Sequence, residues 1–176
     1  CEALKLDARE VIDAASLGYI RTQIPTPGFV GGPCLTKDPH ILFYSATKAG
    51  YSPSLIKSAR ELNESLPVRT ALRICNTLKQ MEIELSVARV FITGFAFKGE
   101  PETDDIRDSP TVELIKELKR LEVSNIVGHD FITPINRIEE CGVPSATLED
   151  GFRGSDAVIF MTRHAAYFGL DISQFI

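Results

Sequence analysis

The stretch that decides the fold is Arg89-Val90-Phe91-Ile92-Thr93-Gly94. A short run rich in β-branched and aromatic residues that ends at a glycine predicts a buried strand. Two further strands are predicted, one from Asn125 to near Asp130 and one over Ala157–Met161. Strands separated by helical stretches favour a parallel sheet, so residues 86–176 are predicted to form a Rossmann-like α/β domain.

A ligand is expected at the carboxyl ends of these strands, because open parallel sheets bind ligands there. The loop Phe95–Asp108 follows the first strand and is the expected ligand edge. Ser109 and Pro110 come next and are typical of an N-cap and a first-turn proline, ahead of a helix predicted over Thr111–Leu121.

The first half of the chain is predicted to be helical. Apolar residues recur at helical spacing over Glu2–Leu17, and a loop rich in proline and glycine, Gly18–Pro33, interrupts that period. Asp38 is expected to cap a short helix that ends at Gly50. A long helix is predicted over Pro53–Met81, kinked or divided at Pro67.

Composition indicates a soluble globular chain with two modules. The 176 residues are 44% hydrophobic and 24% charged, and no uncharged run approaches the ~20 residues that span a bilayer. The net charge of −5 argues against a nucleic-acid partner. Residues 1–85 hold 10 basic and 9 acidic side chains, whereas residues 86–176 hold 9 and 15, which suggests a helical domain followed by an acidic α/β domain.

Cysteine spacing and the start of the chain suggest further expectations. The four cysteines include no CxxC pair and no zinc-type spacing with histidine, so no disulfide framework and no metal site are expected, in a reducing cytoplasm. The chain opens at Cys1, inside a helical pattern and without a signal segment, so a fragment of a longer protein is expected.

The run Gly31-Gly32-Pro33-Cys34-Leu35-Thr36-Lys37-Asp38 places a thiol after two glycines and just before a helix N-terminus. The helix dipole favours a thiolate there, and the glycines let a substrate approach, so Cys34 is a candidate nucleophile. Taken alone, Cys34 is also compatible with a small buried residue and Asp38 with a plain helix cap. Tyr44 and His40 on the short helix are expected to be core residues.

Three runs of sequence carry a resemblance to a known family. The run Gly28–Pro39 resembles the active-site cysteine motif of the nucleotide-sugar 6-dehydrogenases, the UDP-glucose/GDP-mannose dehydrogenase family. The runs Gly94–Lys98 and Thr103–Pro110 resemble its nucleotide-sugar-binding segment. The resemblance implies that residues 1–85 are the central dimerisation domain and residues 86–176 the UDP-binding domain. It also implies that the N-terminal domain with the main NAD site is missing from the chain.

The resemblance implies a chemistry as well. The family oxidises the C6 alcohol of a UDP-sugar to a carboxylate with NAD. Cys34 would form a thiohemiacetal with the intermediate aldehyde and then a thioester. Asp38 matches the family carboxylate that helps to activate the hydrolytic water, a general-base role. Lys37, beside it, would polarise sugar oxygens.

Further residues are implied to bind the substrate or the cofactor. Phe97 and Lys98 match positions that contact the nucleotide sugar, and an ammonium suits a diphosphate. The glycine-rich loop would contact the sugar through three residues, Phe29, Val30 and Gly31.

The resemblance implies that two arginines act outside their own domain or subunit. Arg107 matches a residue that reaches NAD, with an ion pair inside its own acidic loop as the alternative. Arg21 would enter the partner subunit's site, with a plain surface arginine as the alternative. The long central helix is expected to form a homodimer interface or else to pack on its own domain.

The amino-acid sequence of the cysteine run more closely resembles the branch of the family that oxidises UDP-N-acetylhexosamines, of the UDP-N-acetylmannosamine type, than the UDP-glucose branch. UDP-glucose 6-dehydrogenase is the alternative within the family. A cysteine hydrolase would need a histidine base, for which His40 is the nearest candidate in sequence. A fragment that binds nucleotide sugar and dimerises without turnover is the alternative outside enzymes.

Overall fold

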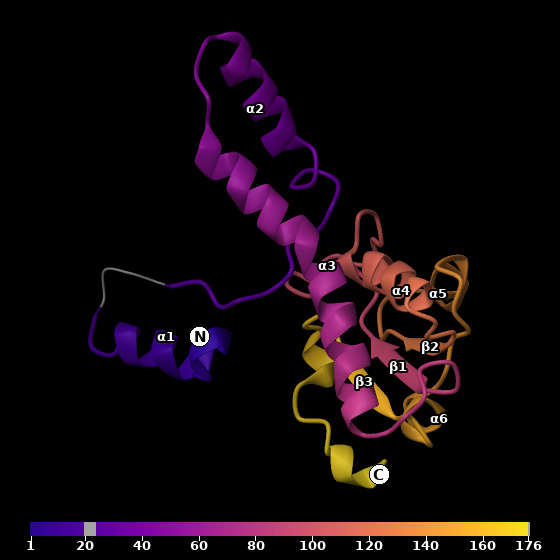
Figure 1. Ribbon diagram of the computed structural model, residues 1–176. Coiled ribbons are helices and arrows are strands. Elements are labelled where there is room, and N and C mark those ends of the chain that lie inside the picture. The colour runs from indigo at the N-terminus through magenta and orange to yellow at the C-terminus, as the bar shows by residue number, and fades with distance from the viewer. Residues whose placement is uncertain (20–23, 176) are drawn as a thin grey trace.

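The computed structural model describes residues 1–19 and 24–175, and Figure 1 shows how its elements are arranged. The elements in chain order are the helices α1 (Ala8–Ser16), α2 (Asp38–Lys48) and α3 (Ser54–Gln80), strand β1 (Arg89–Thr93), helix α4 (Pro110–Arg120), strand β2 (Asn125–His129), helices α5 (Ile135–Glu140) and α6 (Leu148–Phe152), and strand β3 (Ala157–Phe160). Single 3-10 turns lie at Glu2–Leu4, Ala165–Tyr167 and Ile172–Gln174.

The sheet is parallel, with strand order β2-β1-β3. Arg89 pairs with Asn125 at one end of β1, and Thr93 pairs with His129 at the other. Strand β3 pairs along the opposite edge of β1, from Val90 with Ala157 onward. The predicted α/β class and the parallel Rossmann-like sheet are therefore confirmed. Both flanking strands end beside Thr93, so the loops that follow all three strands meet at one edge.

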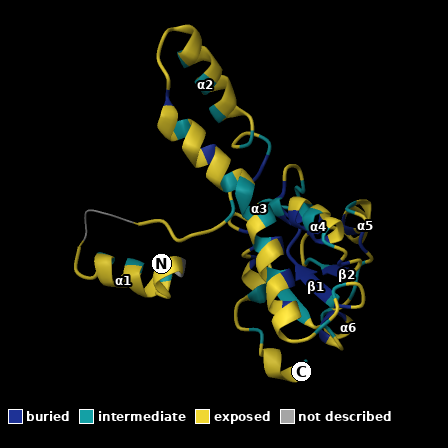
Figure 2. Cartoon of the chain, viewed as in Figure 1, coloured by how far each residue is buried: buried dark blue, intermediate teal, exposed yellow. Residues whose placement is uncertain are grey.

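The two faces of β1 build two cores, because alternate side chains of a strand point to opposite faces. Val90 and Ile92 pack in a cluster with residues of α3 and α4. Phe91 points to the other face and packs on Phe152 of α6, with ring centroids 5.4 Å apart. Buried residues accordingly gather around the sheet in Figure 2.

Helix α3 links the two halves of the chain. Pro67 lies inside it, and the helix is continuous, so division into two helices, one of the two predicted outcomes, is excluded for this described segment. The ribbon of α3 bends, in the sense of the other predicted outcome, a kink (Figure 1). The second half of α3 buries Ala71, Cys75 and Leu78 against the sheet. Its first half pairs with α2 away from the sheet (Figure 1). The domain boundary near residue 85 stays a prediction.

Two predicted helix starts differ from the structure. The pattern over Glu2–Leu17 divides into a 3-10 turn and α1, because Lys5 adopts a left-handed φ of 55° and Asp7 caps a new start by accepting the N–H of Arg9. Asp38 is the first residue of α2, and Lys37 occupies the cap position. The expectation that Asp38 caps this helix is therefore wrong.

Helix α2 leaves its apolar side chains in solvent. Tyr44 is 60% exposed and His40 is exposed, so the expectation that they are core residues is also wrong. Figure 2 shows α1 and α2 mostly in the colour of exposed residues. Within the described residues of one chain, neither helix buries a side chain completely.

Candidate functional site

The cysteine loop presents an exposed thiol just ahead of α2. The Cys34 carbonyl accepts the N–H groups of Lys37 and Asp38 at 3.2 and 2.9 Å, which folds the segment into a turn that continues into the helix. The Cys34 side chain is exposed, so the alternative of a small buried cysteine does not apply. The thiol therefore belongs to a turn that leads directly into the N-terminus of α2.

This loop is docked on the loop that follows β1. The Gly32 N–H donates to the Asp108 carbonyl at 3.2 Å, and Thr36 Oγ1 donates to Asp108 Oδ2 at 3.2 Å. Gly32 has φ +97°, and a Cβ there would lie 2.7 Å from the Phe97 ring. A Cβ on Gly31 would lie 2.6 Å from Pro110. The glycines are thus required for the close approach of the two motifs that sequence reasoning singled out.

Asn63 of α3 holds the loop from the other side. Its Oδ1 accepts the Val30 N–H at 2.9 Å, and its Nδ2 donates to the Val30 carbonyl at 2.7 Å. Phe29 and Val30 line a cavity of about 300 Å³ between the loop, α3 and the start of α4. Arg60, whose side chain is 10% exposed, forms part of its wall and pairs with Glu64 at 3.0 Å.

Two cations lie near the thiol. Lys37 is ion-paired with Asp38, and the hydrogen bond to Asp38 is the main reason that the pKa of Lys37 is raised. Arg107 pairs with Asp105 at 2.6 Å, and that hydrogen bond is the main reason that the pKa of Arg107 is raised. The charge of a Cys34 thiolate makes a smaller contribution in the same direction to both pKa values.

The remaining predicted residues are placed as follows. Lys98 is exposed in the loop after β1, with Nζ 5.5 Å from the centroid of the Phe97 ring. Arg107 makes the ion pair within its own loop that was the alternative reading, yet its side chain is still 69% exposed. Arg21 lies outside the described residues.

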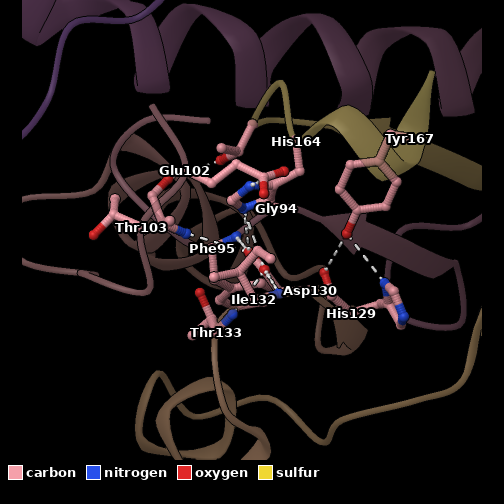
Figure 3. Close-up of polar contacts among 12 residues, drawn as sticks. Gly94, Phe95, Glu102, Thr103, His129, Asp130, Ile132, Thr133, His164 and Tyr167 are labelled. Carbon is pink, nitrogen blue, oxygen red and sulfur yellow. Dashed lines mark hydrogen bonds and ion pairs between the residues drawn. The ribbon is translucent and has the colours of Figure 1, made fainter. Parts of the chain in front are cut away.

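Sequence reasoning missed two groups of residues. Asn63 gave no local signal, because its partner is 33 residues away. Asp130, directly after β2, and His164, in the loop after β3, form a buried polar cluster at the ligand edge (Figure 3). Their signal was positional, since polar residues that follow neighbouring parallel strands meet at one edge of the sheet.

Fold and site together define an α/β protein in which an exposed, cation-flanked cysteine is held against the ligand edge of a parallel sheet. Comparison with known proteins specifies the family. Residues 1–65 match the central domain of the UDP-glucose/GDP-mannose dehydrogenase family, and residues 91–176 match its UDP-binding domain. The chain belongs to this family.

Individual relatives agree with the assignment. The chain is 34% identical to the UDP-N-acetyl-D-mannosamine dehydrogenase of Pyrococcus horikoshii, over 90% of this chain and 34% of that protein. It is 27% identical to the UDP-N-acetyl-D-glucosamine 6-dehydrogenase of Pseudomonas aeruginosa, over 80% of this chain and 33% of the relative. A solved structure of UDP-D-ManNAc dehydrogenase from P. horikoshii superimposes with a TM-score of 0.80 at 27% identity, covering 98% of this chain and 38% of that one. The chain thus spans about a third of the length of these curated relatives.

Two further kinds of feature are absent from the part of the chain that the structure describes. Over residues 1–19 and 24–175, no helix is long and apolar enough to cross a membrane. In the same part of the chain, His, Cys, Asp and Glu side chains form no group of three or more that could hold a metal ion.

Proposed function

We propose that the chain supplies the nucleophile and the nucleotide-sugar side of an NAD-dependent UDP-sugar 6-dehydrogenase. The observation that carries this proposal is the docking of the Cys34 loop on Asp108 and Phe97, because it sets a thiol beside the loop that holds Lys98. Family membership supports the nucleotide sugar as substrate.

Cys34 carries the covalent step in this proposal. Oxidation of the C6 alcohol gives an aldehyde, and the Cys34 thiolate adds to its carbonyl carbon to give a thiohemiacetal. Loss of a second hydride from carbon and of the hydroxyl proton turns the thiohemiacetal into a thioester, and water then cleaves the C–S bond to release the acid and the thiol.

Asp38 is assigned to the hydrolytic step. It is exposed at the first residue of α2, and its own N–H is bonded to the Cys34 carbonyl, so the carboxylate and the thiol belong to one turn of chain. It would take a proton from the attacking water as a general base. Lys37, paired with Asp38, would orient that carboxylate and polarise sugar oxygens.

NAD, when bound, supplies the hydride acceptor for both oxidations. Of this chain's residues, Arg107 is assigned to it, because its guanidinium is exposed next to Asp108, which binds the cysteine loop, and because a guanidinium suits an anionic pyrophosphate. On the substrate side, Lys98 would meet the diphosphate, and Phe29, Val30 and Gly31 would contact the sugar.

The substrate class proposed is a UDP-N-acetylhexosamine of the UDP-N-acetylmannosamine type. The printed names of several relatives support this choice, among them the 34% identical P. horikoshii protein. Calorimetric titration of the chain with UDP, UDP-N-acetylmannosamine and UDP-glucose tests it. Tighter binding of UDP-glucose would contradict the proposed substrate class. If the chain binds none of the three ligands, the proposed function is wrong.

The cysteine route has its own test in a protein that joins this chain to an NAD-binding domain. Cys34→Ser should abolish release of the uronic acid, whereas Cys141→Ser, at a half-buried cysteine, should leave it unchanged. Unimpaired acid formation by Cys34→Ser would rule out the thioester. If both the unaltered protein and the Cys141→Ser variant lack turnover, the result would favour a role in binding and dimerisation.

A homodimer through α2 and the first half of α3 completes the proposal. Exposed apolar side chains on these helices, such as Tyr44 at 60%, Leu55 at 82% and Leu62 at 56%, support it, because a monomer gains nothing from leaving them in water. Sedimentation of the chain should give a dimer that Leu62→Glu dissociates, and a monomeric unaltered chain would refute it.

A further inference from the structure

The carboxyl ends of all three strands meet in a buried polar cluster that the proposed chemistry does not use. Asp130 follows β2 and His164 follows β3, and both side chains are 0% exposed. They lie next to the backbone that follows β1, at Gly94 and Phe95 (Figure 3). This is the edge at which a parallel sheet binds ligands, and the cluster is bonded to the first residues of the loop Phe95–Asp108.

The Asp130 carboxylate binds loops after two strands at once. Oδ2 accepts the N–H groups of Phe95 at 2.6 Å and Ala96 at 3.4 Å. Oδ1 accepts those of Ile132 at 2.7 Å and Thr133 at 2.9 Å. Burial alone would raise the pKa of Asp130, but the N–H groups of Thr133, Phe95 and Ile132 outweigh it and lower the pKa below the usual 3.8. Asp130 is therefore a buried anion at neutral pH.

His164 joins this anion to the loop after β3. Its Nε2 lies 3.2 Å from Asp130 Oδ1, and since a carboxylate can only accept, Nε2 is the protonated nitrogen. Its Nδ1 has no hydrogen-bond partner and lies 3.7 Å from Glu102 Oε1. Glu102 in turn accepts the Ala165 N–H at 3.0 Å.

The loop after β1, which carries Lys98, is also held by the loop after β3. Thr162 Oγ1 donates to the Ala96 carbonyl at 2.7 Å. A Cβ on Gly99 would lie 2.2 Å from the Arg163 carbonyl carbon, so the backbone on the far side of Lys98 rests directly on the loop after β3. Lys98 is thus exposed between two fixed points of backbone.

In a dinucleotide-binding Rossmann domain, N–H groups after the first strand bind the ligand's pyrophosphate. Here the N–H groups of Phe95 and Ala96 are bonded to Asp130, which occupies the place of that anion. We propose that Asp130 and His164 are positioning residues that replace a ligand phosphate at this edge and hold the loop so that Lys98 meets the substrate diphosphate. This role rests on the proposed function.

The test compares UDP with uridine, because the two ligands differ only in the diphosphate. Asp130→Asn and His164→Leu should lower the ratio of UDP to uridine affinity about tenfold, the scale of a lost charge-assisted contact. His164→Gln should restore the ratio, since the glutamine amide can donate to Asp130. In a Lys98→Ala background, Asp130→Asn should lower the ratio no further, because it acts through Lys98.

A matched control separates positioning from stability. Thr147→Ala removes the N-cap of α6 in the same module and should lower the thermal midpoint without changing the affinity ratio. Amide exchange without ligand should show faster exchange at Phe95 and Ala96 in Asp130→Asn. If that variant does not fold, the two His164 variants decide the question.

An unchanged ratio in His164→Leu, or a loss in Asp130→Asn that is equally large without Lys98, would overturn the positioning role. An unaltered chain that binds UDP no better than uridine would instead overturn the proposed function, and with it this role, before any variant is compared.

Discussion

Asn63 is hydrogen-bonded to both backbone polar groups of Val30, accepting its N–H at 2.9 Å and donating to its carbonyl at 2.7 Å. A primary amide offers one acceptor and one donor group in this geometry, as a neighbouring strand would. Helix α3 therefore holds the glycine-rich loop through the backbone of Val30, which lies four residues before Cys34. Since α3 also packs in the sheet core through Ala71 and Leu78, one rigid element places the loop relative to the sheet.

Asn63→Ala should release the loop. Each bond contributes about 1 kcal/mol, so the free energy of opening at Val30 should fall by about 1 to 2 kcal/mol. Hydrogen exchange at the Val30 amide measures it. Asn76→Ala, at an exposed asparagine of the same helix, is the control and should leave that exchange rate unchanged. Equal rates in both variants would show that the amide pair does not hold the loop.

Gly32→Ala should separate the two motifs. Its φ of +97° costs a residue with a Cβ about 1 to 3 kcal/mol, and the Cβ would also clash with the Phe97 ring at 2.7 Å. Urea unfolding should show a lower free energy of unfolding. Gly28→Ala is the matched control, because nothing lies within 4 Å of its Cβ. If both alanine variants unfold at the same urea concentration, the close packing of Gly32 is not required.

The strands and the class of fold could be predicted because their signals are local. Arg89–Thr93 is a run of strand-forming residues that ends at a glycine, and the structure has the strand over the same residues. The helix predicted over Glu2–Leu17 is present over Ala8–Ser16, but its predicted start was wrong because periodicity takes no account of backbone signals. Asp7 followed by Glu10 is a helix-start pattern, and it placed the true start inside the periodic stretch.

The candidate site was less predictable, because contacts between distant segments build it. Thr36 and Asp108 are 72 residues apart, and neither carries a local sign of the other. The motifs around Cys34 and Lys98 could be found, since each has its own chemistry. The residues that hold them, Asn63 and Asp130, could not, because an isolated asparagine or aspartate is common on helices and after strands.

Alkylation should distinguish the cysteines. Cys34 is exposed, whereas Cys75 is 4% exposed and burial raises its pKa. Burial also raises the pKa of the half-buried Cys141. A raised pKa leaves less thiolate at pH 8, so iodoacetamide should modify Cys34 before Cys141, and Cys75 only in urea. Peptide mass spectrometry separates these sites from exposed Cys1. Modification of Cys75 as fast as Cys34 would contradict the core packing of α3.

Stability should depend on pH through His129. The ring lies among aromatic side chains at the end of β2, with Phe131 4.7 Å and Tyr167 6.0 Å away between ring centroids. Burial lowers its pKa below 6.5, and the charge of Asp130 only partly opposes this. The unfolded chain therefore binds the proton more readily, so this contribution to stability is complete above pH 6.5 and is lost as the pH falls through the lower folded pKa.

Between pH 7 and 5, the free energy of unfolding should fall with a slope of at most about 1.4 kcal/mol per pH unit for one proton. His129→Gln keeps a polar group for the Tyr167 hydroxyl, which lies 3.0 Å from Nδ1, but cannot titrate. Urea unfolding of this variant should lack that slope, and an unchanged slope would assign the effect to another group. Asp130 acts in a separate range, because its pKa lies below 3.8.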